Sequence, residues 1–268
     1  PSFLISSGAD MLVYGMAEQP VREIVRLLKK GVPFRSLLTV PQTSVVIDAE
    51  APLPVNKKWD DLMLHSHEQC LADKHLFAEN FVAFEKESHR MKAARLIEPY
   101  RGKNLIVNPP YLPLTEEGAD RIYDLPFMYL PHPKYEGKGP IPAYEMIKFS
   151  VNIHRGCFGG CSFCAIASHQ GKQIVSRSEE SIFREIERIS GLRDFRGYLS
   201  DLGGPSANMY GMKGKQISMC VSCSRPSCIW PSVCTNLDTS HEMLTNLYKK
   251  VNAHKSIKKV FVGSGVRY

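Results

Sequence analysis

Apolar and polar positions in the first 31 residues predict one strand followed by one helix. Residues 11–15 (MLVYG) form an apolar run that suits a strand. Apolar side chains then recur at the spacing of one helix face, and Pro20 suits the first turn of that helix. These positions are Val21, Ile24, Val25, Leu27 and Leu28. Because Gly31 ends the pattern, residues 8–31 are expected to form a strand, a turn and a helix.

A long helix is expected from about residue 73 to residue 97. Large apolar residues recur there every three to four positions, or at a multiple of that spacing, between charged neighbours. They are Phe77, Phe81, Phe84 and Met91. Side chains at this spacing lie on one face of a helix, so we expect them to pack in a hydrophobic core.

Shorter patterns lie on either side of this helix. Residues 36–47 are rich in Leu, Val and Thr and predict one or two strands, whereas two prolines in residues 51–55 predict a connector. Residues 104–107 form a short apolar run that predicts another strand. Thr115 is then expected to cap a brief helix whose first turn carries two glutamates.

The pattern changes after residue 143. Residues 125–142 hold five prolines and predict a surface linker, after which strand-like and helix-like runs alternate. The runs are residues 146–153, 178–189, 195–202, 241–251 and 258–265. This alternation favours an α/β protein with parallel βα units and right-handed crossovers. We expect one domain at residues 1–143 and a second at residues 144–268. A full (β/α) barrel takes about 200 residues or more, so the second domain would be a partial barrel.

Composition is that of a globular chain, with 43% hydrophobic residues in 268. No apolar stretch approaches the roughly 20 residues of a membrane span, and residues 1–31 lack the order of a signal peptide. We therefore expect a cytoplasmic protein. Because the chain begins with Pro1 and closes on a strand-like run, we also expect it to be a fragment of a longer protein.

Charge and cysteine are concentrated in the second half. Residues 1–147 carry 17 basic and 19 acidic groups, whereas residues 148–268 carry 17 basic and 8 acidic groups, a balance of +9. Seven of the eight cysteines lie between Cys157 and Cys234. Because they are closely spaced and no export signal is present, metal binding is favoured over disulfide bonds.

The most specific motif is residues 155–164 (RGCFGGCSFC), in which Cys157, Cys161 and Cys164 follow the spacing C-x3-C-x2-C after an apolar strand. Thiolates at this spacing suit an iron–sulfur cluster, and three of them leave one iron with an open position. The glycines allow positive φ angles and let backbone N–H groups point at the sulfides. Zinc is the alternative, because His154 or His169 would complete a Cys3His site.

This loop resembles the cluster-binding signature of radical S-adenosylmethionine (AdoMet) enzymes, and nearly the whole chain resembles the YgiQ family of radical SAM proteins. The stretches that carry this resemblance are residues 10–24, 108–127, 141–172, 176–182, 200–211 and 264–268. The resemblance implies a truncated Rossmann-like N-terminal domain followed by a partial (β/α) radical SAM barrel.

Roles for single residues follow from the resemblance. Cys157, Cys161 and Cys164 would ligate three irons of a 4Fe-4S cluster, with AdoMet on the fourth, and Phe163 would lie near the adenine. Gly203 and Gly204 occupy the place of the glycine-rich motif that meets the methionine amino group. Pro205 follows where many relatives carry an acid, and residues 264–268 would border the ribose.

A second cysteine group lies in an insertion at about residues 205–237. Cys220, Cys223, Cys228 and Cys234 have spacings that suit a tetrahedral metal or a second cluster. The alternative is that they are reduced structural cysteines. The resemblance includes these residues but implies no role for them.

Taken with the resemblance, the sequence predicts a radical SAM enzyme that cleaves AdoMet to a 5′-deoxyadenosyl radical, which then abstracts hydrogen from a substrate. It would receive electrons from a donor such as flavodoxin or ferredoxin. The rival hypothesis is a non-catalytic zinc or iron–sulfur module with a basic face that binds nucleic acid. That face would hold Lys249, Lys250, Lys255, Lys258 and Lys259, although such lysines more often form a solvated surface.

Overall fold

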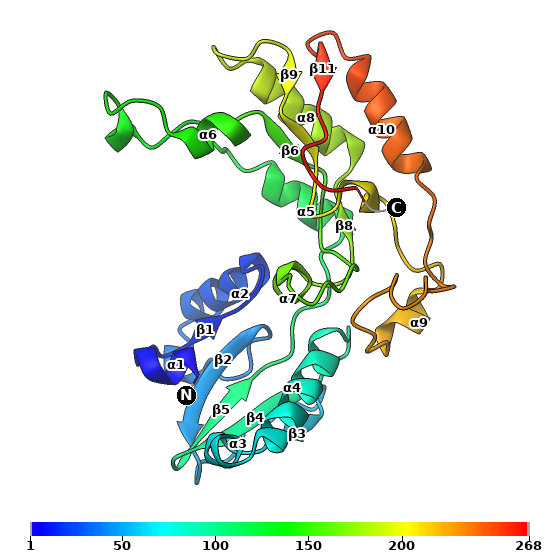
Figure 1. The fold of residues 1–268 in the computed structure, drawn as a ribbon. Helices are drawn as coiled ribbons and strands as arrows, with labels where there is room; N and C mark the ends of the chain where they lie inside the picture. The colour runs from blue at the N-terminus through cyan, green and yellow to red at the C-terminus, as the bar shows by residue number, and fades with distance from the viewer. Residues whose placement is uncertain (1, 267–268) are drawn as a thin grey trace. The chain divides into compact units, whose positions relative to one another are not determined.

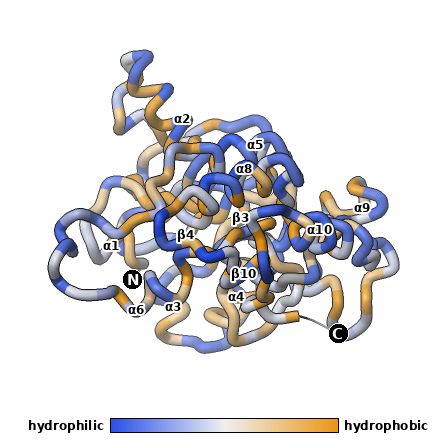
Figure 2. The backbone as a smooth tube through the Cα atoms, turned by 90° about the horizontal axis from the view of Figure 1, so that it is seen from above, coloured by the Kyte–Doolittle hydropathy of each residue, from blue (hydrophilic) through white to orange (hydrophobic). Residues whose placement is uncertain are grey.

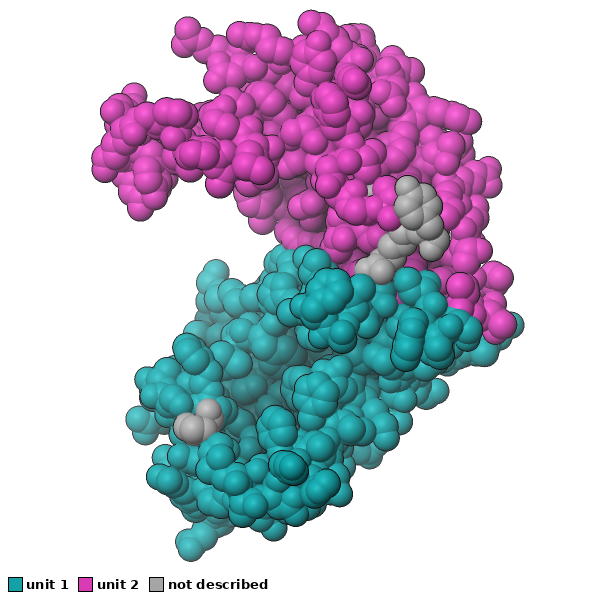
Figure 3. Space-filling view, in the orientation of Figure 1, with its two compact units in different colours: residues 1–112, 159–172, 216–232 teal, residues 113–158, 173–215, 233–268 magenta. Residues whose placement is uncertain are grey.

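Residues 2–266 are described by a computed structural model, which divides them into two units that each mix helices and strands (Figures 1 and 3). Unit 1 holds the described residues up to Leu112 together with residues 159–172 and 216–232. Unit 2 holds residues 113–158 and 173–215 and the described residues from Val233 onward. The expectation of an α/β protein is confirmed.

A five-stranded sheet of order β1-β2-β5-β4-β3 forms the centre of unit 1. Its strands are β1 (Leu12–Val13), β2 (Thr43–Asp48), β3 (Asp61–Met63), β4 (Arg95–Tyr100) and β5 (Lys103–Val107). Ile106 of β5 pairs with Val45 on one side and with Ile97 on the other, and all three side chains are buried. The apolar run at residues 104–107 therefore forms the predicted strand, at the middle of the sheet.

The sheet of unit 1 corrects the Rossmann-like expectation, which implies parallel strands. Only β3 and β4 pair in parallel, whereas the other three pairs are antiparallel. A two-residue hairpin connects β4 to β5, and both of its residues, Arg101 and Gly102, have positive φ angles of 42° and 73°. Because such a turn reverses the chain at once, the two strands it joins must be antiparallel.

The helices of unit 1 are α1 (Phe3–Ser7), α2 (Glu18–Lys29), η1 (Phe34–Ser36), α3 (His67–Ala72), α4 (Lys74–Ser88), α7 (Ile166–Gln170) and α9 (Ile217–Val221). Strand β1 and helix α2 confirm the strand, turn and helix expected over residues 8–31. Residues 51–55 form no helix or strand, in agreement with the predicted connector.

The predicted helix over residues 73–97 is too long, because α4 ends at Ser88 and the residues from Arg95 onward form β4. The buried carboxylate of Glu87 explains the break: it pairs with Arg90 at 2.7 Å and accepts the backbone N–H of Ala94, also at 2.7 Å. These bonds fold the chain back toward the sheet.

The prediction that the apolar face of this helix packs in a hydrophobic core is also wrong. Phe77, Phe81 and Phe84 are 60%, 56% and 44% exposed, respectively. The helical period was correct, but a period shows only that side chains share a face and not which face is covered.

Unit 2 contains the parallel strand pairs expected from the alternating pattern. Its strands are β6 (Ser150–Asn152), β7 (His154–Arg155), β8 (Val175–Ser176), β9 (Tyr198–Leu199), β10 (Asp201–Gly203) and β11 (Lys259–Val260). Strand β10 pairs in parallel with β6, and β9 pairs in parallel with β11. Strands β7 and β8 form a short antiparallel pair.

The helices of unit 2 are α5 (Glu116–Tyr123), η2 (Pro133–Tyr135), α6 (Pro142–Ile147), α8 (Glu179–Ser190), η3 (Ala207–Met209) and α10 (Glu242–Asn252). Thr115 caps α5 as predicted, since its side chain accepts the backbone N–H of Gly118 at 3.1 Å. Met146 and Ile147, expected to begin a strand, instead end α6, because Pro142 favours a helical first turn.

Two amphipathic helices cover the parallel strands of unit 2. Helix α8 buries Ile182, Ile186 and Ile189, and α10 buries a second apolar stripe, against strand residues such as Leu199 and Leu202. Figure 2 shows that hydrophilic and hydrophobic positions are mixed along the backbone. Within residues 2–266, no helix has both the length and the apolar character needed to cross a bilayer.

Candidate metal and cofactor site

Two of the three predicted cluster ligands share one tight turn in unit 1. The backbone N–H of Cys164 donates to the carbonyl of Cys161 at 3.0 Å, directly before helix α7. Cys157, the third, is buried in unit 2 after β7. All eight cysteines lie in the part of the chain that the structure describes, and each is a thiol.

Two of the three glycines of this loop have the positive φ angles that the sequence predicted. Gly156 and Gly160 have φ angles of 88° and 63°, whereas Gly159 does not have a positive φ. A Cβ atom on Gly160 would lie 2.8 Å from the carbonyl oxygen of Pro226 and 2.8 Å from Cβ of Ser227. Another segment of unit 1 therefore packs directly against the backbone of the loop.

This neighbouring segment is the first part of the cysteine-rich insertion. Ser227 is 1% exposed, and its hydroxyl donates to the carbonyl of Gly159 at 2.9 Å. The same oxygen accepts the backbone N–H groups of Ile229 and Trp230 at 3.1 and 2.9 Å. The hydroxyl thus ties the turn of residues 227–230 to the cysteine loop.

Lys172 forms a second connection between the two segments. It is only 4% exposed, and its ammonium group donates to the carbonyl of Arg225 at 2.7 Å and lies 3.6 Å from Sγ of Cys223. Neither Ser227 nor Lys172 stands out in the sequence, because no pattern along the chain shows that residues more than 50 positions apart pack together.

Ser227→Ala is expected to lower the free energy of unfolding by about 1–3 kcal/mol, because the buried carbonyl of Gly159 and two partly buried N–H groups lose their partner. Urea denaturation would measure this. Ser222→Ala is the matched control: Ser222 belongs to the same segment but is exposed, and its replacement should change stability by less than about 0.5 kcal/mol. Equal stability of the two variants would show that Ser227 does not hold the loop.

The predicted glycine pair lies at the carboxyl end of strand β10 in unit 2. A Cβ on Gly203 would collide with Ser264, whose hydroxyl donates to Oδ2 of Asp201 at 2.6 Å. A Cβ on Gly204 would lie 2.5, 2.7 and 2.9 Å from Cε1, Nδ1 and Nε2 of His154. Both positions therefore require glycine because the side chains of Ser264 and His154 in unit 2 pack against them.

His154 in β7 is 1% exposed. Burial lowers the pKa of its imidazole to about 4, so the ring is neutral at pH 7. Neither ring nitrogen has a hydrogen-bond partner among residues 2–266. The sequence alone indicates this histidine only as an alternative zinc ligand.

Cysteines of the second group occupy both units. Cys220 lies in α9, and the backbone N–H of Cys223 donates to its carbonyl at 3.2 Å. Cys228 is half-buried in the same unit, whereas Cys234 belongs to unit 2. Over the described part of the chain, no three His, Cys, Asp or Glu side chains are arranged to hold a metal ion.

The remaining predicted positions lie mostly at the surface. Phe163 is 90% exposed beside the cysteine turn, and His169 and the five lysines of the predicted basic face are exposed as well. Lys250 forms an ion pair with Glu179. Of residues 264–268, Arg267 and Tyr268 lie outside the described residues.

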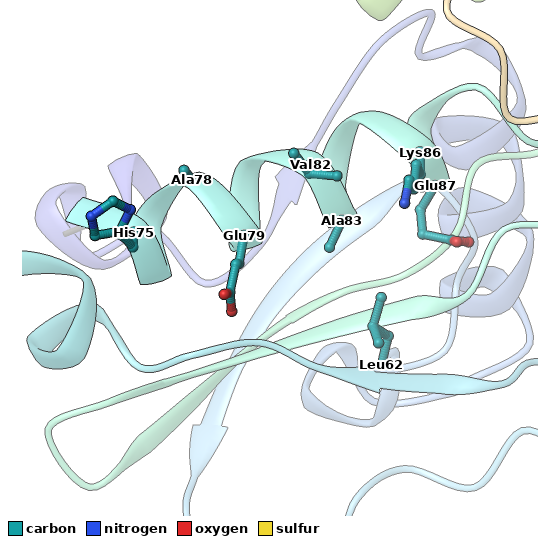
Figure 4. A pocket seen from close by; sticks show the side chains of 8 residues that line it. All are labelled: Leu62, His75, Ala78, Glu79, Val82, Ala83, Lys86 and Glu87. Carbon is teal, nitrogen blue, oxygen red and sulfur yellow. The ribbon is translucent and has the colours of Figure 1, made fainter. Parts of the chain in front are cut away.

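An open pocket lies elsewhere in unit 1, between helix α4 and strand β3. Leu62 and side chains of α4 from His75 to Glu87 line it (Figure 4). It contains none of the residues that the sequence singled out for metal or cofactor binding.

Comparison with known proteins extends these observations. Residues 1–150 match the family model described as Radical SAM N-terminal. A UPF0313 protein of Bacteroides thetaiotaomicron is 52% identical over 278 aligned residues, which cover 100% of this chain and 44% of the relative. The UPF0313 protein YgiQ of Escherichia coli is 36% identical, with 100% of this chain and 43% of the relative covered. No solved structure matches the chain.

This chain thus spans less than half the length of these curated relatives. The match to YgiQ over the whole of this chain confirms the resemblance that the sequence motifs indicated.

Proposed function

Since the chain belongs to the radical SAM N-terminal family, we propose that it is part of an enzyme that binds a 4Fe-4S cluster and AdoMet. When bound, the reduced cluster supplies the electron that cleaves AdoMet to methionine and a 5′-deoxyadenosyl radical, which abstracts hydrogen from a substrate. A carrier such as flavodoxin or ferredoxin would deliver that electron.

The donor set fits this cofactor. Cys157, Cys161 and Cys164 are thiols in a glycine-rich loop, and thiolate sulfur is the usual ligand of iron in such clusters. Gly156 and Gly160 have positive φ angles, and loop backbone of this kind can turn N–H groups toward anionic sulfides. The C-x3-C-x2-C spacing within this loop is the observation that carries the proposal.

The proposed AdoMet site uses the carboxyl ends of the parallel strands in unit 2, where α/β proteins commonly bind ligands. Gly203 and Gly204 would meet the methionine part, and Phe163 the adenine. We propose that these strands begin a partial (β/α) radical SAM barrel, with residues 1–143 as the preceding domain and residues 144–268 as the barrel part. A second metal would bind Cys220, Cys223, Cys228 and Cys234.

Product analysis tests this function. After anaerobic reconstitution with iron and sulfide, the dithionite-reduced protein is expected to convert AdoMet into 5′-deoxyadenosine and methionine. The control is the same mixture without dithionite. AdoMet that stays intact in the presence of a complete, reduced cluster would contradict the proposal, as would a colourless protein that holds one tightly bound zinc ion.

A further inference from the structure

Lys172 carries a buried positive charge that has no carboxylate partner among residues 2–266. It is 4% exposed, and its ammonium group has two hydrogen-bond partners in that range, the carbonyl of Arg225 at 2.7 Å and Sγ of Cys223 at 3.6 Å. Both partners are neutral while Cys223 is a thiol. Because a buried ammonium group without an opposite charge destabilises a protein, this contact indicates a place where a negative charge forms or binds.

The titratable groups near Lys172 do not supply this charge at contact distance. Burial lowers the pKa of the His89 imidazole, and the charge of Lys172 lowers it further against the opposing effect of Glu85. The ring is therefore mostly neutral at pH 7. The carboxylate of Glu85 lies 3.4 Å from Nε2 of His89 and forms no ion pair with Lys172.

Cys223 is the partner that can become negatively charged. Its backbone N–H donates to the carbonyl of Cys220 at 3.2 Å, in the same way that Cys164 bonds to Cys161 at 3.0 Å in the cluster loop. A cysteine binds a metal ion as its thiolate, so metal binding removes a proton and leaves a negative sulfur. A hydrogen bond from an ammonium group to such an anion is stronger than one between neutral groups.

We propose that Lys172 is a positioning residue of the second metal site, where its ammonium group donates to the metal-bound thiolate of Cys223. This inference rests on the second metal of the proposed function and assigns that site a divalent ion. More than two thiolates on a divalent ion leave a net negative charge, which one ammonium group reduces. No three donor side chains converge in the described part of the chain, so the remaining ligands would close around a Cys223 that Lys172 already contacts.

Titration with Co²⁺ tests this role, because the sulfur-to-cobalt charge-transfer band reports thiolate ligands directly. The background is the full chain with Cys161→Ser/Cys164→Ser, so that the cluster loop does not compete for the ion. In this background Lys172→Met should bind Co²⁺ about tenfold or more weakly. The band should also move to longer wavelength, because a thiolate that accepts no hydrogen bond gives up an electron more readily.

Two further variants separate the charge from other effects. Lys172→Arg keeps a positive donor and should bind Co²⁺ within about threefold of the background protein. Lys92→Met is the matched control: the backbone N–H of Lys92 donates to the carbonyl of Val221 beside the same cysteines, but its side chain is exposed. This control should change neither the affinity nor the band.

Metal-free Lys172→Met should have a thermal midpoint no lower than that of the background protein, because methionine removes an uncompensated buried charge. A lower midpoint, or failure to fold, would show that Lys172 is a structural element and that the inference is wrong. Unchanged affinity and an unchanged band in Lys172→Met would overturn it too, as would equal losses in Lys172→Met and Lys172→Arg. If the background protein with Lys172 intact gives no cobalt–thiolate band, the second metal of the proposed function is wrong, and this inference with it.

Discussion

Arg177→Met is expected to lower the free energy of unfolding by about 3–5 kcal/mol, because it leaves a buried carboxylate without its counter-charge. Arg177 is 1% exposed, and its guanidinium group forms an ion pair with the buried Glu185. It also donates to the carbonyls of Asn152 and Ser181 at 2.8 and 2.9 Å and lies 4.0 Å from the ring centroid of Tyr123. One side chain thereby joins β6, α8 and α5.

Arg184→Met is the matched control for this prediction. Arg184 lies on α8 and likewise forms an ion pair, with Asp124 at 2.7 Å, but its side chain is 44% exposed, so the variant should lose no more than about 1 kcal/mol. In the double variant Arg177→Met/Glu185→Met, part of the lost stability should return, because no unpaired charge stays buried. Equal losses for Arg177→Met and Arg184→Met in denaturant titrations would show that the buried pair does not hold the elements together.

Cys161→Ser/Cys164→Ser is expected to abolish the cluster completely. Both thiols belong to one turn, so their loss removes two of three proposed ligands, and a single thiolate does not retain a 4Fe-4S cluster. Iron and sulfide analysis after anaerobic reconstitution would show background levels of the cluster in this variant.

Two further variants test whether cluster loss is specific to Cys161 and Cys164. Cys70→Ser, in unit 1 but outside both cysteine groups, should keep the full cluster content. Cys220→Ser/Cys223→Ser should keep the 4Fe-4S cluster and lose the second metal. Unchanged iron and zinc content in the latter variant would remove the second metal site from the proposal.

Local patterns along the sequence predicted several of the helices and strands of the fold. Helix α8 begins after Ser178, whose hydroxyl accepts the backbone N–H of Ser181, and its isoleucines face the parallel strands as the periodicity indicated. These features depend on neighbours within a few positions, which the sequence displays directly.

Features that depend on distant residues could not be predicted in this way. The carboxylate of Glu87 ends helix α4, although the apolar period continues to Met91. The two-residue turn at Arg101 and Gly102 makes β4 and β5 antiparallel, whereas neighbouring strands of a Rossmann-like sheet are parallel. Similarly, the cysteine spacing predicted the candidate ligands, but not the bond from Ser227 of the insertion to Gly159 of the loop, nor the bond from Lys172 to Arg225 of the insertion.

Electron paramagnetic resonance of the dithionite-reduced, reconstituted protein tests the proposed cluster and its open iron most directly. We expect the signal of a reduced 4Fe-4S cluster whose g values change when AdoMet is added, and no such signal in Cys161→Ser/Cys164→Ser. A cluster signal that AdoMet leaves unchanged, or one that persists without Cys161 and Cys164, would contradict the assignment of this loop as the AdoMet-binding cluster site.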